Sequence, residues 1–136
     1  MPMSLSIDKA FGILPAAVKL QARRTELLAS NLANVDTPEY KSRDFDFRAT
    51  LAAIKGRDDV LPLQRTQSSH IALSFPDEDT HPDLLYRIPA QPALDGNTVD
   101  PQLERAAFAE NTMLYQSSLE FLDRRVSGIR AALRKE

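Results

Sequence analysis

Apolar residues recur at alternating steps of four and three near both ends of this chain. Such spacing is typical of a coiled-coil seam, a narrow apolar stripe along an α-helix, rather than of a broad globular face. Near the N-terminus the repeat is Ile7, Phe11, Leu14, Val18, polar Gln21 and Thr25, then Leu28, Leu32 and Val35. Near the C-terminus it is Phe108, Thr112, Tyr115, Leu119, Leu122, Val126, Ile129 and Leu133. We therefore expect a mainly α fold, with long N- and C-terminal heptad helices packed as a coiled-coil hairpin.

Proline marks the end of the first helix. Pro38 lacks an amide proton and pushes Thr37 toward extended geometry, so the helix must end by about Asp36. We expect it to be regular from Pro15 to Asn34, with Asn34 as its C-terminal cap.

The second helix has a clear start. Asp100 is a candidate N-cap, and Pro101 occupies the first helical position, where a missing amide proton costs nothing. Gly128 lies inside the helix and weakens it without ending it. The chain then divides into an N-terminal helix of the inner coiled-coil domain, a connecting segment and a C-terminal helix of that domain, at residues 1–36, 37–99 and 100–136.

The connecting segment is irregular. Asp46 can cap a short helix from Phe47 to Lys55, and Gly56 is its natural stop. The rest of the segment carries five of the nine prolines, which favours an irregular insert. It supports at most two short strands, Ile71–Phe75 and Leu84–Ile88, which can pair with each other.

Composition excludes several classes of protein. A net charge of −2 and a pI near 5.7 give no electrostatic basis for binding nucleic acid. The chain has no cysteine, which excludes disulfides and thiol chemistry. No apolar run reaches about 18 residues, so we expect no membrane insertion. Residues 10–18 lack the basic flank and cleavage site of a signal peptide.

The sequence indicates no enzyme, metal site or cofactor. His70 and His81 lie near acidic residues without a regular ligand spacing, which favours solvated surface residues. The four glycines are isolated, so there is no phosphate-binding loop. Glu104 and Glu110 are expected on the solvent-facing side of their helix.

Three asparagines stand out because asparagine is a poor helix former. Beyond the cap at Asn34, we expect Asn31 and Asn111 to hydrogen-bond across the hairpin or to a neighbouring subunit; the alternative is simple surface exposure.

Two stretches carry a family resemblance. The segment ASNLANVDTPEYKSRDFDF, which ends at Phe47, resembles the N-terminal signature of the flagellar axial rod proteins. The segment DGNTVDPQLERAAFAENTMLYQSSLEFL, which starts at Asp95, is similar to the C-terminal region of the same family. Together the resemblance covers residues 5–56 and 84–134, in the right order and separation. The RDFDF run favours a proximal rod protein other than FlgC. Glu39 departs from the pattern, since the family usually has glycine there.

The resemblance implies a non-enzymatic structural subunit of the bacterial flagellar basal body. Such a subunit is exported uncleaved through the flagellar type III apparatus and assembles helically in the periplasm as the proximal rod, the drive shaft around the export channel. The implied partners are other copies of itself, the rod proteins FlgC and FlgF, the adaptor FliE and the MS-ring protein FliF. The alternatives are a soluble coiled-coil adaptor, or a different proximal rod protein such as FlgC.

We expect the subunit interface to use the helix end, the aromatic segment after it and the C-terminal heptads. The candidate residues are Asn31, Asn34, Asp36, Thr37, Pro38, Tyr40, Arg43, Phe45, Phe47, Asn111, Tyr115, Leu119, Leu122 and Val126.

Overall fold

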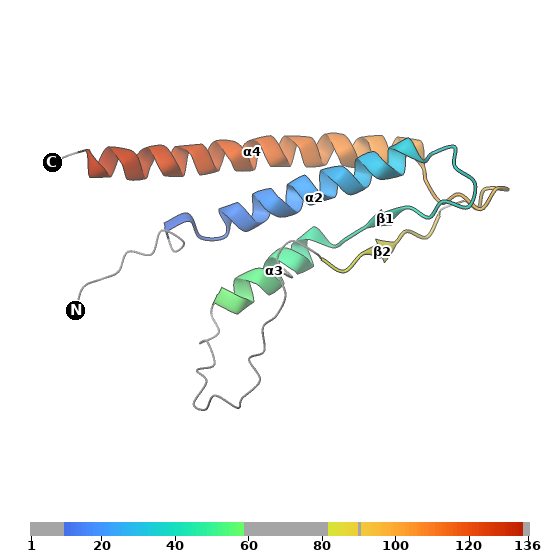
Figure 1. The fold of residues 1–136 in the computed structure, drawn as a ribbon, viewed down its shortest axis with the longest axis horizontal. Helices are drawn as coiled ribbons and strands as arrows, with labels where there is room; N and C mark the ends of the chain where they lie inside the picture. Colours follow the sequence, from blue (N-terminus) through green and yellow to red (C-terminus); the bar gives the residue numbers. More distant parts are fainter. Residues whose placement is uncertain (1–9, 59–81, 90, 135–136) are drawn as a thin grey trace, which may run out of the picture.

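A computed structural model describes residues 10–58, 82–89 and 91–134. Its elements are two long helices, one shorter helix and two short strands: α2 (Leu14–Ala33), β1 (Arg43–Asp44), α3 (Phe47–Asp58), β2 (Leu85–Tyr86) and α4 (Pro101–Leu133). α2 and α4 lie side by side and run in opposite directions (Figure 1). This confirms the expected mainly helical fold with long terminal helices in contact. No helix in the described ranges is long and apolar enough to cross a membrane.

The ends of both long helices agree with the local signals. The amide of Asn34, the C-cap of α2, bonds back to the carbonyls of Ser30 and Asn31. At the start of α4, Asp100 Oδ1 accepts hydrogen bonds from the amides of Gln102 at 3.0 Å and Leu103 at 3.2 Å. These side-chain acceptors satisfy donors that a helix start otherwise leaves unpaired.

The start of α3 was predicted correctly and its end was not. Asp46 Oδ1 accepts a 3.0 Å bond from the amide of Ala49, as an N-cap should. The expected stop at Gly56 is wrong, because α3 continues to Asp58. Glycine ends a helix by adopting positive φ, and Gly56 does not do so. It remains an ordinary helical residue that costs about 1 kcal/mol relative to alanine.

The two strands form a small antiparallel sheet in which Arg43 lies opposite Tyr86 and Asp44 opposite Leu85. β2 falls within the predicted strand Leu84–Ile88, but here its partner is β1. The other predicted strand, Ile71–Phe75, lies outside the described residues.

α2 is buried on two sides, which is wider than a coiled-coil seam. One side faces α4 and includes Leu28, which is fully buried. The other side carries Leu20 and Leu27, which form a core with Phe45 and Ile54. The chain after α2 therefore folds back and covers the side of the helix that α4 leaves open (Figure 1).

Candidate functional site

The loop after α2 is held by one side chain from the far end of the connecting segment. Asn97 is almost fully buried, and its Nδ2 lies 3.0, 2.9 and 2.8 Å from the carbonyl oxygens of Asn34, Val35 and Thr37. Carbonyls at a helix end have no partner within the helix. Asn97 therefore fixes the path of the chain as it leaves α2.

A strained residue follows. Glu39 has φ of 60°, and its amide donates a 2.8 Å bond to the carbonyl of Asp95. Gly96, itself at φ 74°, lies beside this residue, and an added Cβ would meet Glu39 Cγ at 3.6 Å, an ordinary van der Waals contact. A left-handed conformation costs a non-glycine residue about 1–2 kcal/mol. This is the position where the sequence departs from the family pattern.

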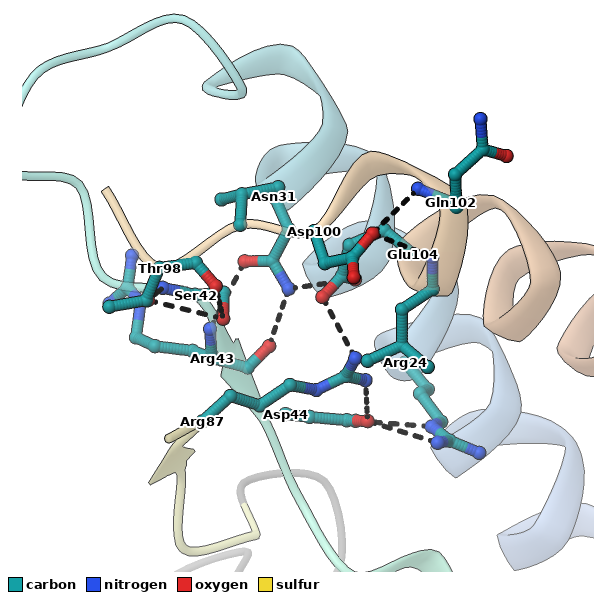
Figure 2. A network of polar contacts seen from close by, with 12 residues as sticks. Arg24, Asn31, Ser42, Arg43, Asp44, Arg87, Thr98, Asp100, Gln102 and Glu104 are labelled. Atoms are coloured by element: carbon teal, nitrogen blue, oxygen red, sulfur yellow. Dashed lines mark hydrogen bonds and ion pairs between the residues drawn. The ribbon is translucent and has the colours of Figure 1, made fainter. Parts of the chain in front are cut away.

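On one side of β1, the side chain of Asn31 makes the hydrogen bonds that a neighbouring strand would make. Its Nδ2 donates to the carbonyl of Arg43 at 2.8 Å, and its Oδ1 accepts from the amide of Arg43 at 3.1 Å (Figure 2). The hydroxyl of Tyr40 also donates to Oδ1, at 3.3 Å. A side-chain amide thus satisfies both backbone groups of one strand residue, which fastens β1 to α2.

Four charged side chains continue this arrangement, and with Asn31 we call them the junction network: Arg24, Asn31, Asp44, Arg87 and Glu104 (Figure 2). Arg24 donates two hydrogen bonds to Asp44, from Nε to Oδ1 at 3.1 Å and from Nη2 to Oδ2 at 2.9 Å. Arg87 donates to Asp44 at 2.8 Å and lies 2.9 Å from Glu104 Oε1 as an ion pair, without the alignment of a hydrogen bond. Asn31 Nδ2 reaches Glu104 Oε2 at 3.2 Å.

Burial and pairing move the pKa values of the two carboxyls in opposite directions. Burial would raise the pKa of Asp44, but hydrogen bonds from Arg24 and Arg87 outweigh it, so the pKa is lowered. For Glu104, burial dominates over the bond from Asn31 and the charge of Arg87, so its pKa is raised. Removing one partner of a buried ion pair leaves an uncompensated charge, which is strongly destabilising.

The expectation that Glu104 faces solvent is wrong, since its exposed fraction is 0%. The repeat itself gave no signal for this, because its alternating steps would reach back from Phe108 to Arg105. A different spacing did: Glu104 lies seven residues before Asn111, which was expected to bond across the hairpin, so the two share one side of the helix. A carboxylate in a seam is stable only with buried partners, and these come from elements distant in sequence.

Asn111 bonds across the hairpin. Its Nδ2 lies 2.9 Å from the carbonyl of Gln21 and 2.8 Å from the hydroxyl of Thr25, both on α2. Like Asn31, it is buried. The asparagines therefore follow the cross-hairpin alternative rather than surface exposure.

The remaining candidate interface residues have different surroundings. Phe45 is buried within the subunit, whereas Asp36, Thr37, Pro38 and Leu119 are exposed. The others are half-buried: Asn34, Tyr40, Arg43, Phe47, Tyr115, Leu122 and Val126.

α4 also exposes a line of large apolar residues outside the heptad seam. Leu103, Leu114 and Phe121 are 53%, 44% and 58% exposed. They are spaced by eleven and seven residues, which places them on one side of a helix. We call them the outer stripe. They were not predicted, because they lie outside the C-terminal repeat that starts at Phe108.

The junction network is built to hold segments together. Each of its charged groups faces an opposite charge, and it joins α2, β1, α4 and the residue after β2. In the described part of the chain, no group of three or more side chains of the types that ligate metals is gathered.

Comparison with known proteins relates the sequence of this chain to one family. A family profile described as "Flagella basal body rod protein" matches residues 16–41. The flagellar basal body rod protein FlgB of Cereibacter sphaeroides (strain ATCC 17029 / ATH 2.4.9) is 44% identical over 125 residues, which are 92% of this chain and 94% of the relative. FlgB of Aeromonas hydrophila is 43% identical over 136 residues, covering 98% and 99%. FlgB of Escherichia coli (strain K12) is 44% identical over 130 residues, covering 90% and 91%.

Proposed function

This chain belongs to the FlgB family of flagellar basal body rod proteins, and we infer from this that it builds the proximal rod by helical assembly around the export channel. It is a structural, non-enzymatic subunit of the rod. Helical assembly means repeated contacts between unlike surfaces that do not close into a ring.

The outer stripe of α4 is the observation that supports this proposal most directly. Three large apolar side chains lie exposed along one side of a 33-residue helix whose inner side already contacts α2. An apolar surface of this kind marks an interaction site. Lateral packing of neighbouring subunits against α4 would bury it.

The other candidate residues contribute in two ways. The exposed loop of Asp36, Thr37 and Pro38 is fixed by Asn97 and is available for contact at the end of the hairpin. Buried residues such as Phe45 and Asn111 act indirectly, because they set the position of the surfaces that neighbours meet.

We assign the finer partners on the same basis. Assembly occurs with other flagellar rod components; within that group we propose copies of this chain, FlgC and FlgF as rod neighbours, and FliE and FliF at the base. Delivery is proposed to use the flagellar type III export apparatus, with the chain uncleaved and assembling in the periplasm.

The test changes the outer stripe without changing the hairpin. Leu114→Glu with Phe121→Glu places two charges where a neighbour would pack, and both side chains are largely exposed in the single subunit. We expect the variant to keep the helical circular dichroism of the wild type, to lose rod assembly in isolated basal bodies, and to lose motility.

The matched control is Ser127→Glu, an exposed position six residues beyond Phe121 and so about 120° away around α4. It should support assembly. Normal rods from the double variant would contradict the proposed surface. The adaptor alternative would instead be favoured by two results together: the purified chain sediments as a dimer at every concentration, and rods still form in cells that lack this chain.

A further inference from the structure

β2 turns one face toward the rest of the subunit and the other face away from it. The guanidinium of Arg87 pairs with both carboxyls of the junction network, so the face that carries Arg87 is the inner one. Neighbouring side chains of an extended segment point to opposite faces. The side chains that point away from the subunit are therefore Leu84, Tyr86 and Ile88, and we call them the outer β2 face.

The outer β2 face is apolar and exposed. Leu84, Tyr86 and Ile88 have exposed fractions of 36%, 69% and 95%. Apolar surface of this kind marks an interaction site. α2 lies between β2 and α4 (Figure 1), and the outer β2 face points away from both helices. In the described part of the chain, the outer stripe and the outer β2 face therefore do not cover each other.

We propose that the outer β2 face of one copy of this chain packs on the outer stripe of the next copy in the rod. The inference rests on the proposed function, and it names the surface that covers the outer stripe. Helical assembly requires contacts between unlike surfaces, because a contact between two copies of the same surface closes into a dimer. A strand face against a helix stripe satisfies this requirement and leaves both surfaces free to continue the row.

The two surfaces match in length. Leu114 and Phe121 are seven residues apart, which is about 11 Å along a helix at ~1.5 Å per residue. Leu84 and Ile88 are four residues apart, which is about 13 Å along an extended segment at ~3.3 Å per residue. Tyr86, in the middle of the outer β2 face, therefore lies between Leu114 and Phe121 of the neighbour.

Charge at the ends of the two surfaces selects one orientation. Asp83 is exposed directly before the outer β2 face. Arg125 is exposed four residues beyond Phe121 on the same side of α4, and its Nε donates to a neutral backbone carbonyl, so its charge stays available. Opposite charges across an interface fix how two surfaces meet. With Asp83 beside Arg125, β2 runs opposite to α4 of the neighbour, and Ile88 lies beside Leu114.

Cysteines in separate chains test this contact, because the chain has no cysteine of its own. Cells would produce Ile88→Cys and Leu114→Cys together, and their isolated basal bodies would be oxidised. We expect a disulfide dimer with one chain of each variant, formed about tenfold faster than from Leu85→Cys with Leu114→Cys, since Leu85 lies on the inner face. Equal rates, or dimers from Leu114→Cys alone, would overturn the proposal.

Charged substitutions separate this proposal from the proposed function. Tyr86→Glu with Ile88→Glu should keep the helical circular dichroism of the wild type and lose rod assembly, as the outer-stripe variant does. Leu85→Glu, at a position that is 58% exposed, should keep both. Normal rods from the Tyr86 and Ile88 variant would overturn the pairing of the two surfaces. The proposed function would then still stand if the outer-stripe variant lost its rods.

Discussion

At the scale of single residues, strain and charge are concentrated where α2 ends. Glu39 occupies a left-handed backbone conformation, and its neighbour in space, Gly96, does so without cost. Glu104 is a fully buried carboxylate whose partners come from other elements. The effect of substitution on stability at these two positions is therefore expected to come from backbone strain at Glu39 and from charge at Glu104, rather than from burial of apolar surface.

Glu39→Gly should stabilise the subunit. The change removes the cost of positive φ, and the exposed Glu39 side chain has no hydrogen bond in the described structure to lose. The expected gain is about 1 kcal/mol, which raises Tm by a few degrees. Asp36→Gly, in the same loop but without positive φ, should give no gain. A lower Tm for Glu39→Gly would show that the turn does not require this conformation.

Glu104→Gln should change how stability depends on pH. Because the pKa of Glu104 is raised in the folded state, that state holds the proton more tightly than the unfolded chain. The contribution of Glu104 is therefore complete below its ordinary value of 4.5 and is lost as the pH rises through the raised value. The wild type should lose stability relative to Glu104→Gln as the pH rises from 4.5 through the raised value, in denaturation curves recorded at several pH values.

Asp44→Asn provides a control of opposite sign. The pKa of Asp44 is lowered in the folded state, so its stabilisation is present above 3.8 and is lost in acid. The wild type should therefore gain stability relative to Asp44→Asn as the pH rises. Identical pH profiles for the two variants would contradict the opposed shifts.

At the scale of elements, glycine has two different roles in this chain. Gly128 lies inside α4, and an added Cβ would meet no atom within 4 Å. Gly12 has equal space but φ of 57°. Gly128→Ala should therefore stabilise α4 by about 0.5–1 kcal/mol, whereas Gly12→Ala should destabilise by a similar amount or more. Thermal melts followed by circular dichroism distinguish these signs, and a loss in both variants would mean that space rather than backbone conformation decides.

α2 shows what an apolar pattern predicts for an element and what it omits. The step of four and three correctly indicated the side that meets α4. Leu20 and Leu27 lie on a second side, seven residues apart, and are buried by Phe45 and Ile54. The second side was not predicted because its covering residues follow no helical period of their own.

At the scale of the whole molecule, one small core holds the connecting segment on the hairpin. Phe45→Ala removes its central aromatic ring and should cost about 3–5 kcal/mol. Small domains have a total stability of about 5–15 kcal/mol, so this is a large share. The free energy of unfolding from urea denaturation measures it. Leu94→Ala, at a fully exposed position, is the control and should be near neutral; equal losses would contradict the role of the core.

The parts of the candidate site that depend on neighbouring residues could be predicted from the sequence, and the contacts between distant residues could not. Asn34, Asp46 and Asp100 were identified as caps because capping depends on residues one to three positions away. Arg24, Asp44 and Arg87 were not identified as a network, because their partners lie 20 and 43 residues apart in sequence. The end of α3 was wrong because glycine permits a helix stop without requiring one.

The sequence by itself determined the two long helices, their ends, the irregular connection and, through resemblance, the family. These depend on periodicity and on local backbone chemistry, which are written in consecutive residues. Only the tertiary structure decided that the connecting segment folds back on α2 and that Glu104 is buried. It also decided that β1 pairs with β2 and bonds to the Asn31 side chain. Burial and hydrogen bonding between distant segments depend on which surfaces meet, and that follows from packing the whole chain at once.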